Sequence, residues 1–445
     1  MTKNLDRREF LMAATAAGVA LTHGSGRAAS AADMPALLGG APVRKGGGGR
    51  SWPIVSESDE EAVAEVARTG RWYRNRSVEQ FEEEYARLNG AKFCVAVSSG
   101  TSALFASLGG LGIGPGDEVI VAPYTFVATV NVALLHYAMP VFADSDRETF
   151  LIDPAKIEAV ITERTAAIIP VHIGGAPCDM DAILAVAKKR NIPVIEDACQ
   201  AHLAQYHDRK VGNWGATGCF SFQVSKNLSS GEGGAILTND EAIAAKCYAF
   251  HNNCRKPKVA SYDFTYDGGR ATNLRMTEFQ GALLLSQMKG LAERAETRSA
   301  NADYLTQMLG EIPGIAPARP CPGATRNAYH LYMFRYDPTE FANMPRSKFI
   351  QALGAEGISA SGGYGPLNKA AFIQNALNTR PYVRVYGEKA IREWEERNRC
   401  PENDKLCEEA VWFTQSMFLG PRSDMDEIAA AVRKLHSHAA QLAKV

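Results

Sequence analysis

The feature that most constrains the fold of this chain is an alternation of short apolar runs with amphipathic helical stretches, which starts near residue 93. The apolar runs cover residues 93–97, 118–122, 166–171, 193–196, 219–222 and 234–238. Helical periodicity lies between them, at residues 102–111, 129–137, 154–161 and 181–190. Short apolar runs that alternate with helices predict a mostly parallel sheet with helices on both faces. We therefore expect a large α/β domain.

The remaining segments predict helices before the sheet and a smaller domain after it. Helical periodicity appears at residues 58–68 and 78–88, and a long helical stretch at 277–311 leads away from the sheet. The later residues contain a strand-like stretch at 329–336 and helical stretches at 347–356 and 425–443. We expect an N-terminal arm and the large α/β domain over residues 32–290, and a smaller α+β domain over residues 291–445.

The first 31 residues show the ordered features of a secretory signal peptide. A charged start with Arg7 and Arg8 precedes an apolar run over residues 10–21, which leads to the small-residue sequence at 29–31. Paired arginines followed by Phe-Leu are typical of the twin-arginine type. The alternative is a basic N-terminus before a core helix. Residues 1–31 therefore predict export, with the periplasm as the expected destination and no stable membrane anchor.

Charge and composition exclude several classes of function. The formal net charge is −1, so the chain lacks the basic field that nucleic-acid binding requires. Beyond the N-terminus, no stretch has the ~18 consecutive apolar residues of a membrane helix. The nine cysteines form no CxxC pair and the nine histidines form no HExxH motif. We therefore expect no nucleic-acid partner and no metal.

Two segments that follow predicted strands carry groups suited to an anionic or heterocyclic ligand, because open α/β sheets bind ligands beyond the carboxyl ends of their strands. Gly100 and Thr101 lie in a Ser/Gly/Thr turn that begins a helix, where free N–H groups favour a phosphate. The alternative for this turn is simple helix capping. Asp197 ends an apolar strand and could hold a protonated ring nitrogen. The alternative for Asp197 is a partner for nearby backbone or for a lysine.

Two later segments complete the set of candidate residues. Lys226 lies between a buried-looking strand and a glycine-rich turn. Desolvation lowers the proton affinity of such a lysine and makes it a usable nucleophile, whereas the alternative is a surface lysine in a loop. Asn273 and Arg275 precede the long helical stretch, where the alternative is helix capping.

Together these segments resemble fold type I pyridoxal-phosphate enzymes, and more closely the DegT/DnrJ/EryC1/StrS family of sugar and aminocyclitol aminotransferases. The resemblance covers residues 37 to 434 approximately. It rests on Pro123-Tyr124-Thr125-Phe126-Val127-Ala128-Thr129, Ile169-Pro170-Val171-His172, Asp179-Met180-Asp181, Cys219-Phe220-Ser221-Phe222, Lys226-Asn227, Gly231-Glu232-Gly233-Gly234 and Asn273-Leu274-Arg275-Met276-Thr277-Glu278-Phe279-Gln280.

The resemblance implies a role for each candidate residue toward pyridoxal 5'-phosphate. Lys226 would bind the cofactor aldehyde covalently and later move a proton, and Asp197 would hold the pyridine nitrogen. The remaining contacts implied are the phosphate for Gly100, Thr101 and Ser221, the ring face for Phe126, the ring hydroxyl edge for Gln200, the phosphate of a neighbouring subunit for Asn273, and the donor carboxylate for Arg275. A shared site of this kind implies a homodimer.

The activity implied is a ping-pong amino transfer from an amino acid, glutamate or glutamine, to a keto-sugar or keto-cyclitol. One alternative is a pyridoxal-phosphate-dependent sugar dehydratase, but Lys226 argues against it because dehydratase relatives carry histidine there. The other alternative is an exported binding or sensor protein that keeps the fold without turnover. Asn368 stands where the family usually has histidine, which affects the expected substrate recognition.

Overall fold

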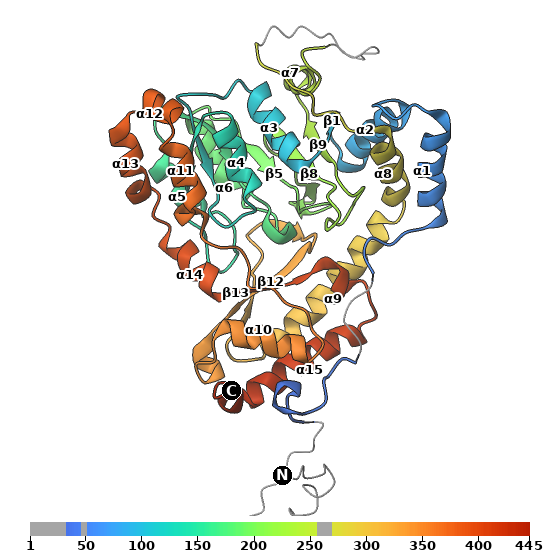
Figure 1. Cartoon of the computed structure of the whole chain (residues 1–445), viewed down its shortest axis with the longest axis vertical. Coiled ribbons are helices and arrows are strands. Elements are labelled where there is room, and N and C mark those ends of the chain that lie inside the picture. The colour runs from blue at the N-terminus through green and yellow to red at the C-terminus, as the bar shows by residue number, and fades with distance from the viewer. Residues whose placement is uncertain (1–32, 46–50, 256–268) are drawn as a thin grey trace, which may run out of the picture.

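A computed structural model describes residues 33–45, 51–255 and 269–445 of the chain (Figure 1). The signal peptide expected over residues 1–31 lies outside the described residues. Within them, no helix combines the length and the apolar character needed to span a bilayer.

The large domain is built on a seven-stranded sheet in the order β1-β9-β8-β5-β4-β2-β3. A four-stranded and a three-stranded part are joined through the parallel bridges of Ile168 with Val194 and of Val171 with Asp197. Strand β9 runs antiparallel to both of its neighbours, and the other pairs are parallel. The strands are β1 (Phe93–Val97), β2 (Glu118–Val121), β3 (Met139–Phe142), β4 (Thr165–Ile169), β5 (Ile195–Asp197), β8 (Thr217–Ser221) and β9 (Gly234–Thr238). The α/β architecture expected from the sequence is confirmed.

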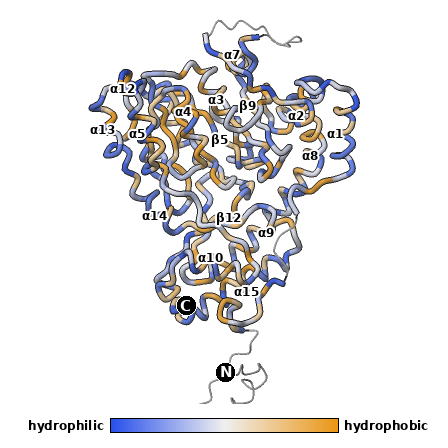
Figure 2. Tube along the Cα trace, viewed as in Figure 1, coloured by the Kyte–Doolittle hydropathy of each residue, from blue (hydrophilic) through white to orange (hydrophobic). Residues whose placement is uncertain are grey.

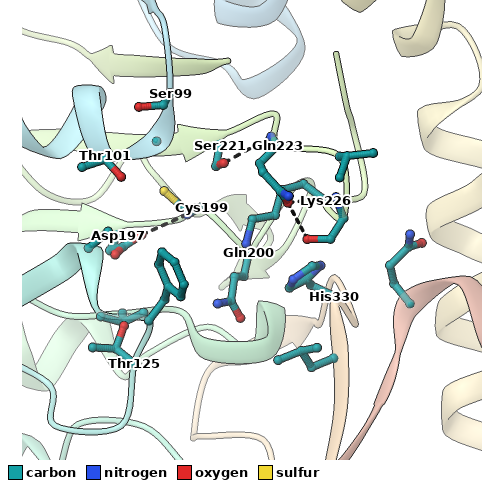
Figure 3. Close-up of a pocket in the computed structure, with 18 of the residues that line it drawn as sticks. Ser99, Thr101, Thr125, Asp197, Cys199, Gln200, Ser221, Gln223, Lys226 and His330 are labelled. Atoms are coloured by element: carbon teal, nitrogen blue, oxygen red, sulfur yellow. Dashed lines mark hydrogen bonds between the residues drawn. The ribbon is translucent and has the colours of Figure 1, made fainter. Parts of the chain in front are cut away.

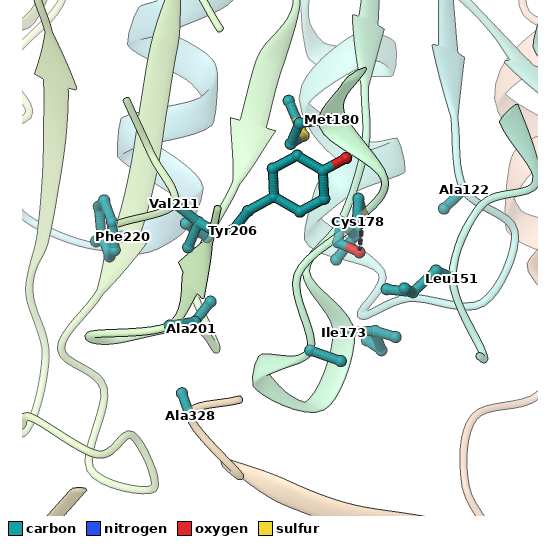
Figure 4. Packing of buried hydrophobic residues seen from close by; sticks show 14 of the residues in the cluster. Ala122, Leu151, Ile173, Cys178, Met180, Ala201, Tyr206, Val211, Phe220 and Ala328 are labelled. Carbon is teal, nitrogen blue, oxygen red and sulfur yellow. Dashed lines mark hydrogen bonds between the residues drawn. The ribbon is translucent and has the colours of Figure 1, made fainter. Parts of the chain in front are cut away.

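Helices cover both faces of this sheet, because alternate side chains of each strand point to opposite sides. In β1, Val95 and Val97 join a core with helices α3 (Gly100–Gly110), α4 (Ala128–Leu135) and α7 (Glu241–His251). Its neighbours Cys94 and Ala96 join the opposite core, part of which is shown in Figure 4. That face is covered by α2 (Arg76–Asn89), α5 (Pro154–Val160), α6 (Met180–Lys189) and α8 (Glu278–Met288). Figure 2 shows the apolar segments gathered in the interior of this domain.

The long helical stretch expected over residues 277–311 is two helices rather than one. Helix α8 packs against α1 (Glu57–Thr69) and α2, and the chain breaks at Lys289-Gly290 before α9 (Leu291–Gly310) begins. Glycine is a poor helix former, which suits it to this break. The break redirects the chain, so that α9 runs from the large domain into the smaller one (Figure 1).

The smaller domain contains an antiparallel sheet of β10 (Ile315–Pro317), β12 (Leu331–Tyr336) and β13 (Ala410–Thr414). Helices α9, α10 (Arg346–Ala355) and α15 (Ser423–Ser437) pack on it around a separate apolar core. Apart from three helices described next, the other elements of the described chain are β6 (Gln205–Tyr206), β7 (Arg209–Lys210), β11 (Ala324–Arg326), α14 (Pro401–Glu409), α16 (Ala439–Leu442) and the short 3-10 helices η1 (Ala36–Leu38), η2 (Ile173–Gly175), η3 (Pro338–Phe341), η4 (Leu367–Lys369) and η5 (Gln415–Phe418).

Three helices from the C-terminal part of the chain pack against the large domain. They are α11 (Ala371–Leu377), α12 (Arg380–Tyr386) and α13 (Glu388–Arg397). The indole N–H of Trp394 donates to the carbonyl of Pro140 over 2.7 Å, and Arg397 makes a bidentate ion pair with Glu118 at 2.7 and 2.8 Å. This segment lies within the sequence range expected for the smaller domain, yet its apolar residues complete the core around β2 and β3.

Candidate active site

A cavity of about 810 Å³ lies at the carboxyl ends of the central strands, where the two domains meet. Loops after β1, β5 and β8 form one side, and Tyr364, Trp412 and Gln415 contribute from the C-terminal part of the chain. Figure 3 shows Thr101 and Asp197 across the pocket from Lys226 and His330. Seven of the nine residues expected from the sequence line the cavity: Gly100, Thr101, Phe126, Asp197, Gln200, Ser221 and Lys226.

Gly100 and Thr101 at the N-terminus of α3, together with Ser221 at the end of β8, form a group that we call the phosphate cradle. The Ser99 hydroxyl caps the helix by accepting a hydrogen bond from the backbone N–H of Ser102 over 3.0 Å. A Cβ at position 100 would lie 2.7 Å from the Ser221 Cβ, so only glycine allows this close approach. Helix N-termini carry partial positive charge and free N–H groups. The cradle therefore fits a phosphate group.

Asp197 is a buried carboxylate that faces the cavity. Its Oδ2 accepts a hydrogen bond from the Thr129 hydroxyl over 2.8 Å, and its Oδ1 accepts one from the backbone N–H of Cys199 over 3.2 Å. The adjacent carboxylate of Glu196 points to the other side of the strand. There it accepts three backbone N–H groups of residues 212–215 over 2.6 to 2.8 Å, and the His172 imidazole over 3.0 Å. Asp197 is thus the carboxylate available to a ligand.

Lys226 is half-buried at the cavity wall, in the tight loop between β8 and β9. Its backbone N–H donates to the carbonyl of Gln223 over 2.8 Å, which holds the turn. Burial lowers the pKa of the Lys226 amine below its usual value, while nearby Cys199 and Asp197 act in the opposite direction. An amine that is more readily deprotonated is a better nucleophile toward an aldehyde. The donor set of Lys226, Asp197 and the phosphate cradle therefore fits pyridoxal phosphate.

Gln200 and Phe126 border the space between the cradle and the lysine. The Gln200 Oε1 accepts the backbone N–H of Gly174 over 2.8 Å, and its Nε2 donates to the Tyr364 hydroxyl over 3.0 Å. These two bonds fix the orientation of the amide. Phe126 is 55% exposed at the cavity wall, which leaves its ring free to cover a ligand.

The structure does not bring Asn273 and Arg275 into this cavity. Asn273 is exposed on the loop before α8, where its backbone forms an isolated antiparallel β-bridge with the backbone of Asn252. The Arg275 guanidinium donates to the Asn252 side chain over 3.0 Å. In their own chain, both residues belong to the outer surface of the large domain. Asn368 also lies outside the cavity, in a buried amide network with Asn403.

Several cavity residues escaped the sequence reasoning. Among them, His330 hydrogen-bonds Asn227 at 3.3 Å, and burial and the nearby Lys226 place the pKa of His330 well below its usual value. Tyr364, Gln415 and Trp52 also line the cavity. Asn227, the hydrogen-bond partner of His330, directly follows Lys226 in the sequence, and this was the available signal for a residue at the place of His330. Tyr364 lies in the same short stretch as Asn368, for which the resemblance pointed only to Asn368, whereas Gln415 and Trp52 come from segments without a motif.

Comparison with known proteins adds independent information. A family model described as DegT/DnrJ/EryC1/StrS aminotransferase family matches residues 53–433. The L-glutamine:2-deoxy-scyllo-inosose aminotransferase of Streptoalloteichus tenebrarius is 35% identical over 424 residues, which cover 92% of this chain and 98% of that protein. The spore coat polysaccharide biosynthesis protein SpsC of Bacillus subtilis is 40% identical over 314 residues, which cover 69% of this chain and 80% of that protein.

Two solved structures resemble most of this chain. The crystal structure of 3-amino-5-hydroxybenzoic acid synthase matches with a TM-score of 0.77 and 26% identity, over 89% of this chain and 100% of that chain. An aminotransferase from Psychrobacter cryohalolentis matches with a TM-score of 0.76 and 30% identity, over 88% of this chain and 99% of that chain.

Proposed function

We propose a substrate class for this chain from the premise that it belongs to the DegT/DnrJ/EryC1/StrS aminotransferase family and is a pyridoxal-phosphate-dependent transaminase. The fold type and the enzyme class expected from the sequence are confirmed. The proposed reaction moves the amino group of L-glutamine to the ketone of a cyclitol. Its support is a relative named for glutamine and 2-deoxy-scyllo-inosose, which matches this chain over nearly the full length of both.

The observation that carries the proposal is the convergence of Lys226, Asp197 and the phosphate cradle on one cavity. Gly100, Thr101 and Ser221 would hold the cofactor phosphate, and Lys226 would bind the aldehyde carbon. Phe126 would cover the ring, and Gln200 would contact its hydroxyl edge. When bound, pyridoxal phosphate supplies an electron sink that stabilises negative charge on the substrate carbon.

The residues of this chain would then perform three tasks. Asp197, held by Thr129, keeps a proton on the ring nitrogen through its negative charge. The Lys226 amine, with its lowered pKa, takes the proton from the substrate carbon and returns it. The C-terminal part of the chain, through Tyr364 and Trp412, closes the cavity and limits the access of water.

Two properties of the whole protein belong to the same proposal. The signal sequence expected over residues 1–31 would export the loaded enzyme to the periplasm, where a free keto-cyclitol is a more suitable acceptor than a cytoplasmic nucleotide sugar. Recovery of the activity in the periplasmic fraction of cells tests this, and its loss on Arg7→Lys with Arg8→Lys identifies the route. The exposed Asn273 would bind the cofactor phosphate of a second subunit, which implies a homodimer.

The test of the function is chemical trapping followed by amino transfer. Borohydride treatment of the yellow protein should fix the cofactor to the peptide that contains Lys226, and Lys226→Ala should abolish this product. Lys246→Ala, at an exposed lysine on α7, is the matched control and should change nothing. L-glutamine should bleach the visible band, and the keto-cyclitol should restore it. Trapping on another lysine would contradict the site, and a band that no donor bleaches would contradict the reaction.

A further inference from the structure

Helix α9 carries a buried cation that the proposed mechanism does not use. Arg298 is fully buried, at 0% exposure. Its Nε donates to the Gln415 Oε1 over 2.8 Å, but Nη1 and Nη2 have no hydrogen-bond partner among the described residues. An arginine presents five N–H donors, and most of those of Arg298 are unused.

The surroundings of Arg298 make this charge costly. Its guanidinium lies 5.4 Å from the centre of the Trp52 ring, and a second cation, Arg294, lies 5.9 Å from the same ring. Burial, with a smaller effect from Arg294, lowers the pKa of Arg298 to about 9. Buried charges without a counter-ion strongly destabilise a fold. A ligand that brings a negative charge would offset this cost.

Arg298 lies directly behind the cavity wall, because its two contacts, Trp52 and Gln415, both line the cavity. A guanidinium can only donate, so the oxygen of the Gln415 amide must face Arg298. The Nε2 atom of this amide is not one of the buried side-chain atoms that lack a hydrogen-bond partner. It is therefore available to a ligand in the cavity that Gln415 lines. The Gln415 backbone N–H also donates to the carbonyl of His330 over 3.1 Å. His330 in turn interacts electrostatically with Lys226.

We propose that Gln415 and Arg298 form the subsite that binds the carboxylate of the amino donor. The inference rests on the proposed function and adds the recognition of its first substrate. The planar fork of an arginine matches a carboxylate. The phosphate cradle uses backbone N–H groups and hydroxyls, so Arg298 remains for a second anion. A keto-cyclitol is uncharged, and therefore the amino acid is the substrate that supplies this anion.

The carboxylate would contact the two residues of the subsite one after the other, Gln415 first and Arg298 second. The Gln415 Nε2 can donate to the carboxylate directly. The terminal nitrogens of Arg298 become accessible when the Trp52 indole, now held by its N–H bond of 2.7 Å to the Val224 carbonyl, moves aside. Binding of a carboxylate should therefore change the indole fluorescence, and Trp52→Phe should remove that change.

The decisive variants are Gln415→Glu and Arg298→Met in the cofactor-loaded enzyme. Gln415→Glu gives Arg298 an internal counter-ion in the same place, so it should not lower the melting temperature. Both variants should raise the KM for L-glutamine about tenfold or more, as the loss of a charge-assisted hydrogen bond predicts. The KM for the acceptor should stay within about twofold in both. Arg294→Met, one turn earlier and on the same ring, is the matched control and should leave both values unchanged.

A binding measurement separates this inference from the reaction itself. Glutaramate is glutamine without its amino group, and glutaramide replaces its carboxylate by a neutral amide. Glutaramate should raise the melting temperature of the loaded wild-type enzyme, and glutaramide should not. The shift should disappear in Arg298→Met and Gln415→Glu. Equal shifts by the two probes, or an unchanged KM for glutamine in both variants, would overturn the subsite. If no donor bleaches the wild-type band while the glutaramate shift behaves as described, the subsite stands and the proposed function fails.

Discussion

Two adjacent carboxylates at the end of β5 should respond in opposite ways to the same isosteric change. Asp197→Asn should retain the fold, because an amide can still accept the N–H of Cys199 and pair with the Thr129 hydroxyl. The neutral side chain no longer holds a proton on the cofactor nitrogen, so the rate of amino transfer should fall on the order of 100-fold or more. Steady-state kinetics together with the melting temperature measures both effects.

The matched variant is Glu196→Gln. Its two oxygens accept four hydrogen bonds, and an amide nitrogen in place of one oxygen would face two donors. Groups left unpaired in this way cost about 2–4 kcal/mol in total, so this variant should lower the free energy of unfolding. A stable but inactive Glu196→Gln protein beside an active Asp197→Asn protein would reverse the roles assigned to the pair.

The sequence identifies the residues on the large-domain side of the site better than those on the other side. Asp197 ends β5, and Gly100 and Lys226 follow β1 and β8. The carboxyl ends of strands are a general location of ligand sites in α/β sheets. The choice between Glu196 and Asp197 needs the register of β5, because one position more or less exchanges the two faces. Gln415 and Tyr364 reach the cavity from segments whose position depends on how the domains pack, and no local pattern predicts that.

Helix α3 and strand β8 meet at Gly100 so closely that one methyl group should disturb the phosphate cradle. In Gly100→Ala, the new Cβ would lie 2.7 Å from the Ser221 Cβ and 2.8 Å from the Cys199 sulfur. The start of α3 must then move away from Ser221, which spreads the groups that contact the phosphate. We expect the affinity for pyridoxal phosphate to fall about tenfold or more, or ~1.4 kcal/mol. Titration of the cofactor-free protein measures it.

The control is Gly354→Ala on α10. Apart from the chain neighbours and the backbone of its own helix, nothing lies within 4 Å of the added Cβ at that exposed position. Alanine is the better helix former by about 0.5–1 kcal/mol, so this variant should unfold at a slightly higher temperature and bind the cofactor normally. Unchanged cofactor affinity in Gly100→Ala would show that the contact between α3 and β8 does not shape the phosphate site.

At the scale of whole elements, long periodic segments are predictable and short interrupted ones are not. Strands β1 and β9 have the expected bounds, because each is an apolar run between clear turn residues. Strand β3 was not expected. It has four residues, includes Pro140, and pairs with β2 at the edge of the sheet, where a proline is tolerated. The break at Gly290 was also missed, because one glycine inside a periodic stretch does not by itself end a helix.

The packing of the whole molecule is the level that the sequence predicts least. Helices α11 to α13 lie between elements of the smaller domain in the chain but pack on the large one. There Tyr386 donates to the Asp117 carbonyl over 2.8 Å, and Trp394 is buried beside β3. Order along the chain predicts neighbours in space only where connections are short. The fold class is predictable from the sequence because it depends on the sheet. The shape of the cavity is not, because it depends on both domains.

Asn273 is exposed in its own chain, so its proposed contact with a cofactor phosphate can be tested only in an assembly of two chains. If Asn273 binds the phosphate of the other subunit, each site combines Lys226 of one chain with Asn273 of the other. Lys226→Ala and Asn273→Ala homodimers should then both be inactive or nearly so. In a mixed dimer, one site loses both residues and the other site keeps both.

Random reassociation of equal amounts makes half of the dimers mixed, each with one intact site of two, so about one quarter of the wild-type activity should return. The recovery requires exchange of subunits, and covalent cross-linking of each homodimer before mixing should prevent it. If Asn273 served its own chain, every site in the mixed dimer would lack one residue, and mixing would restore nothing. If the Asn273→Ala homodimer were as active as the wild type, Asn273 would have no role in the site of either subunit. Recovery near one quarter therefore places the residue that lies outside its own cavity in the cavity of its partner.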